Sequence, residues 1–153
     1  MMIGSERPKA VLYLNCQPPQ LPLNYQQLAP AQLSQEILQN NNNNWRKILT
    51  IYAKLTAPNE DWRNHLHTKL LSENQIHFDA SLVKEATTHI IAGKNNWCRF
   101  DHLNANKGEL SQKTWLFLPP NIYLTPYPDY RQFPNILIEE CRTALHQNGE
   151  VLR

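Results

Sequence analysis

Two stretches of the chain carry the clearest hydrophobic patterns. Residues 9–16 (KAVLYLNC) are apolar and β-prone, and the prolines that come after them remove backbone donors, so this stretch predicts a short buried strand. Residues 45–55 instead repeat apolar side chains at spacings of three and four, which is typical of one face of a helix. That face consists of Trp45, Ile48, Leu49, Tyr52 and Leu55.

Three further helices are predicted from their start and stop signals. Pro30 suits the first turn of a helix over residues 30–39, and the asparagine run at 40–44 ends it because Asn competes for backbone hydrogen bonds. Pro58 and the acids after it begin a helix that reaches about residue 73. The last helix is predicted over residues 134–148, with Pro134 in its first turn and Gly149 past its end.

The pattern changes to strand-like runs in the second half of the chain. Residues 87–92 are β-prone, residues 93–96 are typical of a turn, and residues 97–103 alternate as a second strand. Together with strands near 75–78, 110–118 and 122–124, this order predicts one α+β domain with a small antiparallel sheet and helices packed on one face. Its parts are an irregular Pro/Gln-rich segment (17–30), a helical part (30–74), a strand-rich part (75–125) and a C-terminal helix (134–148).

Composition narrows the classes of function. The chain has 153 residues with 11 Pro and 4 Gly, and the glycines are too far apart for a dinucleotide fingerprint or a P-loop, so we expect no nucleotide cofactor and no other cofactor. The three cysteines have long spacings and no CxxC pair, which favours a reducing, cytoplasmic location. No apolar run approaches the length of a membrane span, so we expect no membrane partner.

One constellation of titratable residues suggests metal chemistry. His77 and Asp79 lie two apart on a predicted strand, and His89 lies on a neighbouring one. If the three converged, they could ligate a divalent ion and activate water for phosphodiester hydrolysis. Because no metal-binding motif accompanies them, we predict no resident metal and keep a small metal-dependent nuclease as the alternative function.

Aromatic and basic residues on adjacent predicted strands suggest nucleic-acid contact. Trp97, Arg99 and Lys113 would together stack on bases and neutralise phosphates. The net charge of +2 is too small to demand such a partner, so RNA remains an open alternative.

Two proline-stiffened segments suggest protein contacts. Pro19 and Pro22 lie in a stretch compatible with a polyproline II helix, which can dock in aromatic grooves. The second segment presents tyrosine and arginine, residue types that are enriched at interface hot spots. Its candidate contact residues are Tyr127, Tyr130, Arg131 and Phe133.

Residues 87–93 (TTHIIAG) resemble the third-strand signature of BRCT domains, in which a Thr-His pair precedes an apolar strand. The resemblance covers seven residues. The glycine turn after the first helix and the Trp of the last helix are absent, and BRCT domains alternate strands and helices around a parallel sheet, unlike the predicted antiparallel fold. We therefore do not assign the chain to that family.

The sequence favours a non-catalytic accessory or adaptor subunit that packs against larger protein subunits. One setting is a small subunit of an RNA-guided, CRISPR-type nucleoprotein complex. The metal-dependent nuclease and a direct RNA- or DNA-binding module are the alternatives.

Overall fold

A computed structural model describes residues 1–100, 103 and 114–148 and shows an α+β domain built on a six-stranded mixed sheet. The strand order is β1-β3-β2-β4-β6-β5. The strands are β1 (Met2–Gly4), β2 (Ala10–Tyr13), β3 (Gln75–His77), β4 (Thr88–Ala92), β5 (Leu116–Leu118) and β6 (Ile122–Thr125). The helices are η1 (Tyr25–Gln27), α1 (Pro30–Asn40), α2 (Asn43–Thr56), α3 (Trp62–Thr68), α4 (Leu70–Glu73), α5 (Lys94–Trp97) and α6 (Asn135–Asn148).

The four central strands are parallel, which corrects the antiparallel arrangement predicted from the sequence. β2 pairs in parallel with β3 and β4, β4 does so with β6, and only the edge pairs β1–β3 and β5–β6 are antiparallel among the strands described. The predicted strand over 97–103 is wrong as well. Gly93 does not start a hairpin, because the chain turns there into α5, and the next strands described are β5 and β6. The parallel central strands remove one difference from BRCT domains, but β3 is followed by β4 with no helix between them, and the glycine turn and the Trp of the last helix are absent.

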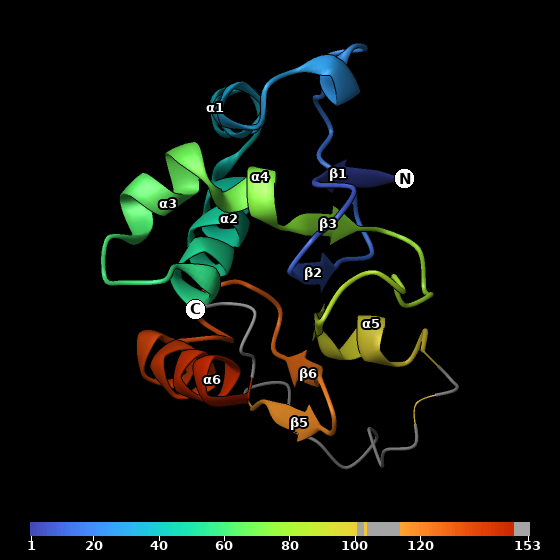
Figure 1. Cartoon of the computed structure of the whole chain (residues 1–153), viewed down its shortest axis with the longest axis vertical. Coiled ribbons are helices and arrows are strands. Elements are labelled where there is room, and N and C mark those ends of the chain that lie inside the picture. The colour runs from blue at the N-terminus through green and yellow to red at the C-terminus, as the bar shows by residue number, and fades with distance from the viewer. Residues whose placement is uncertain (101–102, 104–113, 149–153) are drawn as a thin grey trace.

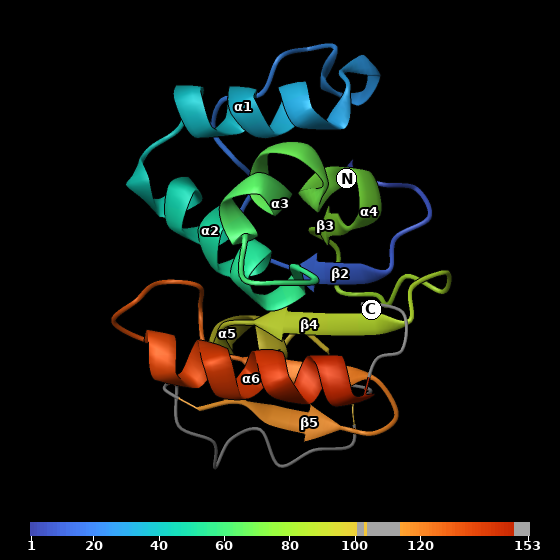
Figure 2. The same cartoon turned by 60° about the vertical axis from the view of Figure 1, so that its left-hand side comes forward.

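Helices cover both faces of the sheet, unequally. Helices α1, α2, α3, α4 and α6 lie on one face, as predicted, and the short α5 lies on the other. In Figure 1 the sheet separates α2 and α6, to its left, from α5, to its right. Figure 2 shows α6 running alongside β4 and β5.

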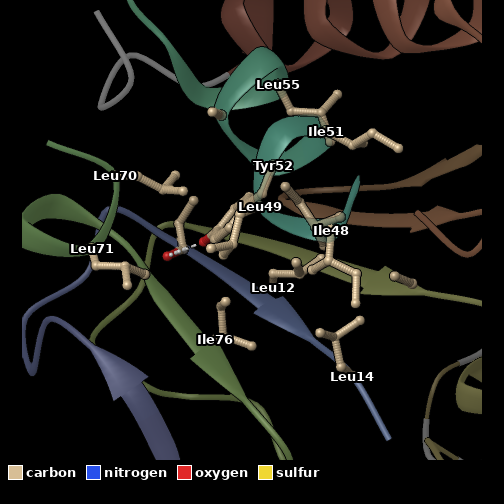
Figure 3. Packing of buried hydrophobic residues seen from close by; sticks show 14 of the residues in the cluster. Leu12, Leu14, Ile48, Leu49, Ile51, Tyr52, Leu55, Leu70, Leu71 and Ile76 are labelled. Carbon is tan, nitrogen blue, oxygen red and sulfur yellow. Dashed lines mark hydrogen bonds between the residues drawn. The ribbon is translucent and has the colours of Figure 1, made fainter. Parts of the chain in front are cut away.

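The main core lies between the sheet and α2. Figure 3 shows the buried side chains of α2 gathered over the inner strands, where Leu12 of β2 is flanked by Ile76 of β3. Tyr52 is fully buried and its hydroxyl hydrogen-bonds to the backbone oxygens of Ala10 (3.0 Å) and Gln75 (2.8 Å). The apolar face predicted for this helix is therefore the face that binds the sheet.

Helix starts coincide with the capping residues of the sequence. The side chain of Asn42, within the asparagine run, accepts a hydrogen bond from the backbone N–H of Asn44 and begins α2. Asp61 caps α3 in the same way through the N–H of Asn64. Such caps satisfy backbone donors that a helix leaves without partners. These two polar side chains thereby cap the first turns of α2 and α3.

A second core lies under α5. Trp97 is fully buried, and its indole N–H lies 2.9 Å from the backbone oxygens of both Ile91 and Thr125. These oxygens belong to β4 and β6, so one side chain holds α5 against two parallel strands. Phe100 and Tyr13 complete this cluster with an edge-to-face contact at 5.4 Å between ring centroids.

Candidate functional site

A pocket lies at the carboxyl ends of the central parallel strands. In open sheets with parallel strands, ligands bind beyond these ends, where neighbouring connections leave in different directions. Here the connection after β2 leads to the helical face, and the connection after β4 leads to α5 on the other face. We call this cavity of about 280 Å³ the carboxyl-edge pocket; its lining residues are Asn15, Ala92, Gly93, Lys94, Asn95, Asn96, Tyr127 and Gln132.

Gly93 shapes one wall of this pocket. Its φ of +89° lies in the region that favours glycine, and its N–H donates to the oxygen of Thr125 at 2.9 Å. The ring of Tyr127 packs directly over it, and the Tyr127 hydroxyl accepts a hydrogen bond from Asn44 Nδ2 at 2.9 Å. Strand ends and the cap region of α2 together fix this wall.

Asn96 forms the buried floor of the pocket. It is 1% exposed, and its Nδ2 donates to the backbone oxygen of Tyr13 at 2.8 Å. Its Oδ1 accepts a hydrogen bond from Arg99 at 3.0 Å, and Arg99 also donates to the oxygen of Phe78 at 2.8 Å. The ends of β2 and β3 are thereby tied to α5, with a guanidinium group directly behind the floor.

Two basic side chains lie at the carboxyl-edge pocket. Lys94 lines it, Arg99 lies behind it, and the described residues of its lining include no Asp or Glu. Asp129 lies in the loop that also carries Tyr127, but its carboxylate forms an ion pair with Lys47 at 3.8 Å. A lining of amide groups and a cation favours an anionic ligand.

The metal-site hypothesis fails on geometry. His77 and His89 lie on the same face of the sheet, but Tyr13 of the intervening strand separates them, with its ring centroid 5.8 Å from each imidazole. Asp79 is near His77 (3.9 Å) and pairs with the amino group of Met1 at 3.2 Å. Within the described residues no group of three His, Cys, Asp or Glu side chains is placed to hold a metal ion.

His89 instead belongs to a buried hydrogen-bond chain. The backbone N–H of Val83 donates to the Tyr13 hydroxyl, and that hydroxyl lies 2.8 Å from His89 Nδ1. The direction of the hydrogen bond between Tyr13 and His89 depends on the tautomer of His89, since a hydroxyl can both accept and donate. Burial lowers the pKa of His89 and raises the pKa of Tyr13 to about 12, so both groups stay uncharged near neutral pH.

The residues predicted to contact nucleic acid do not form a stacking surface. Trp97 is buried with its N–H bonded to backbone oxygens, so it offers no face to a base, and this part of the prediction is corrected. The guanidinium of Arg99 is engaged with Asn96 and Phe78. Lys113 lies outside the described residues.

The residues predicted to contact proteins differ in how exposed they are. Pro19 and Arg131 are exposed and Pro22 is half-buried, so they are accessible to a partner. Tyr130 is half-buried under Lys54, whose ammonium lies 4.9 Å from its ring. Phe133 is 1% exposed and belongs to the main core, so its side chain is not accessible to a partner and its predicted contact role is wrong. Tyr127 lines the carboxyl-edge pocket.

Five polar residues of the pocket were not singled out from the sequence: Asn15, Lys94, Asn95, Asn96 and Gln132. The signal for the first three was present, because Asn15 comes after one apolar strand and the pair Lys94 and Asn95 comes after another. Had the two strands been taken as parallel, their carboxyl ends would have met at one edge. The predicted antiparallel sheet does not require these two ends to meet.

Comparison with known proteins gives one match. The model of a family of unknown function, DUF6942, matches residues 1–146. No curated protein and no solved structure matches the chain. Among the described residues, no helix is long and apolar enough to cross a membrane.

Proposed function

The chain belongs to the DUF6942 family, and we propose from its own geometry that it is a non-catalytic interaction module that binds a phosphate group of a partner protein. The ligand would occupy the carboxyl-edge pocket. The observation that carries this proposal is the placement of Lys94 and several amide side chains around one pocket where the parallel strands end.

Two features favour a phosphate over a carboxylate or a larger ligand. A volume of about 280 Å³ is below the usual range of small-molecule sites, which begins near 300 Å³, so the pocket suits one compact group. The donors that line it, Asn15, Lys94, Asn95 and Gln132, are more numerous than the two oxygens of a carboxylate require.

The size of the pocket also favours a macromolecular partner. One buried anionic group supplies little affinity beyond the cost of association, so further contacts are needed around it. The accessible residues next to the pocket include Arg131, which comes after the loop that carries Tyr127. A phosphorylated segment of a protein would supply the phosphate and the flanking contacts at once.

The proposed module has the properties expected of an accessory subunit. Within the described residues, the pocket lining contains no pair of nucleophile and base and no metal-binding group, which favours recognition over catalysis. Membership of an RNA-guided, CRISPR-type complex stays a prediction from the sequence. RNA is the competing ligand, because its backbone also presents phosphates.

The test is a binding measurement with three fluorescent probes. These are a degenerate peptide library with a fixed phosphoserine or phosphothreonine, the same library without phosphate, and a single-stranded RNA of random sequence. We expect the phosphorylated library to bind more tightly than its unphosphorylated counterpart, and inorganic phosphate to compete. Equal binding of both libraries would refute phosphate recognition, and RNA binding that phosphopeptides do not displace would overturn the protein partner.

Two variants locate the binding. Lys94→Met removes the cation of the pocket, and because a hydrogen bond to a charged group contributes about 1.5–3 kcal/mol, affinity for the phosphorylated library should fall by at least about tenfold. Lys84→Met is the matched control, since Lys84 is exposed and does not line the pocket. Equal affinities of the two variants would place the ligand elsewhere.

A further inference from the structure

A larger groove, separate from the carboxyl-edge pocket, lies among α1, α2 and α3. Its volume is about 860 Å³. We call it the helical groove; its lining residues are Ala29, Ala31, Gln32, Gln35, Leu38, Gln39, Arg46, Thr50, Trp62, Arg63, Leu66 and His67. None of these residues lines the carboxyl-edge pocket, so a ligand in the groove would not be the one bound in that pocket.

The groove combines an apolar lining with a basic rim. Leu38 and Trp62 are partly exposed and supply apolar surface, Leu66 is buried, and Arg46 and Arg63 are exposed. No Asp or Glu is present among the described lining residues. We propose that the helical groove binds an amphipathic helix of a partner protein whose apolar face is flanked by acidic side chains.

The walls of the groove explain why the ligand is a helix. All but one of the lining residues belong to α1, α2 and α3, and the exception, Ala29, directly precedes α1. Helices satisfy their own backbone groups, so these walls cannot pair with an extended peptide as a strand edge does. A ligand that also satisfies its backbone internally is an α-helix, which presents apolar residues at spacings of three, four and seven.

The charge of the rim selects the kind of helix. Two exposed arginines, with no carboxylate among the described lining residues, attract acidic side chains and disfavour basic ones. Nucleic acid fits less well, because base binding relies on aromatic faces. Trp62 already has the Lys54 ammonium 5.0 Å and the Arg63 guanidinium 4.4 Å from its ring, so a stacked base would have to displace a cation.

The test uses three fluorescent peptides of 16 residues and measures anisotropy with the full chain. The first forms a helix with leucines at positions 4, 8, 11 and 15 and glutamates beside them. The second has the same composition in an order that abolishes the apolar face. The third replaces the glutamates with lysines. We expect only the first to bind. Equal binding of the second or third peptide would overturn the proposal.

Substitutions place the ligand in the groove. Ala31→Glu adds a carboxylate to the lining at an exposed position in the first turn of α1, where an acid stabilises the helix, so the variant should fold. We expect it to weaken binding at least about tenfold, and Arg63→Glu to weaken it by about threefold, as for an exposed ion pair. Lys84→Glu changes net charge in the same direction but lies outside the groove and should preserve affinity.

Further measurements distinguish the proposed helix from other ligands of the helical groove. Thermal melting of each variant separates loss of fold from loss of binding. Lys94→Met should bind the acidic peptide normally, which distinguishes this groove from the carboxyl-edge pocket. If sedimentation shows that the chain self-associates and Ala31→Glu abolishes this, the occupant is a second copy and the proposed partner is wrong. Binding to anionic vesicles without binding to the acidic peptide would contradict it too.

Discussion

Replacing Trp97 by phenylalanine tests how α5 is held on the sheet. The substitution removes two buried carbon atoms, which contribute about 0.8 kcal/mol each. It also removes an N–H that lies 2.9 Å from the backbone oxygens of Ile91 and Thr125, and because the Thr125 oxygen still accepts from Gly93, the loss is that of one buried hydrogen bond, about 0.5–1.5 kcal/mol. We therefore expect the free energy of unfolding to fall by about 2–3 kcal/mol.

Chemical denaturation monitored by intrinsic fluorescence measures this change, and calorimetry provides a second readout. For a chain of this length, a loss of about 2–3 kcal/mol corresponds to a decrease in Tm of about 4–12 °C. Trp62→Phe is the matched control, because Trp62 is only half-buried at the border of the helical groove and should lose less than about 1 kcal/mol. If the two variants lost equal stability, the anchoring role of Trp97 would be refuted.

The same geometry gives three further expected outcomes. Burial lowers the pKa of His65 and of His89, so the unfolded chain takes up protons before the folded one, and stability in urea should decrease from about pH 7 to about pH 5; a flat profile would contradict this. Gly4→Ala places a Cβ against the carbonyl oxygen of Asn74 at a φ of +102°, so Tm should fall by at least about 4 °C, and an unchanged Tm would show that β1 adapts freely. Tyr52→Phe deprives two backbone oxygens of a buried hydroxyl and should cost about 1–2 kcal/mol by denaturation, with a loss near zero counting against that contact.

Helices with a regular apolar period could be predicted from the sequence. The residues of α2 that pack on the sheet are those that repeat at helical spacing, whereas the helix predicted from Pro58 to about residue 73 begins only at Trp62 and is divided into α3 and α4. Apolar spacing is a signal that acts over a few residues, so it does not depend on the remainder of the chain. Strand direction carries no such local signal.

The parallel direction of the central strands could not be predicted, because it depends on contacts between segments that are far apart in the sequence. Gly93 with Lys94 and two asparagines after it suits a hairpin turn as well as the start of a helix. The chain forms the helix, in which the indole of Trp97 is buried with its N–H beside backbone oxygens of β4 and β6. The carboxyl-edge pocket depends on the parallel strands that end beside this helix, so its residues could not be grouped before the topology was known.

The metal-site hypothesis failed for a related reason. His77 and His89 lie on one face of the sheet, but their strands are not neighbours as predicted, because β2 pairs with both β3 and β4 and lies between them. β2 inserts there and brings Tyr13 between the two imidazoles. The spacing of residues along one strand indicates which side chains share a face of the sheet, but it gives no distance between residues on different strands.

The most direct test of the proposed function is an NMR titration of the ¹⁵N-labelled chain with a phosphoserine peptide taken from the bound library. The account predicts that the amide signals of Asn15 and of Gly93 to Asn96 shift first and furthest, that Lys94→Met suppresses these shifts, and that the same peptide without phosphate produces none. Shifts that are confined to other surfaces, or that are equal with and without the phosphate, would contradict the claim that the carboxyl-edge pocket recognises a phosphorylated partner.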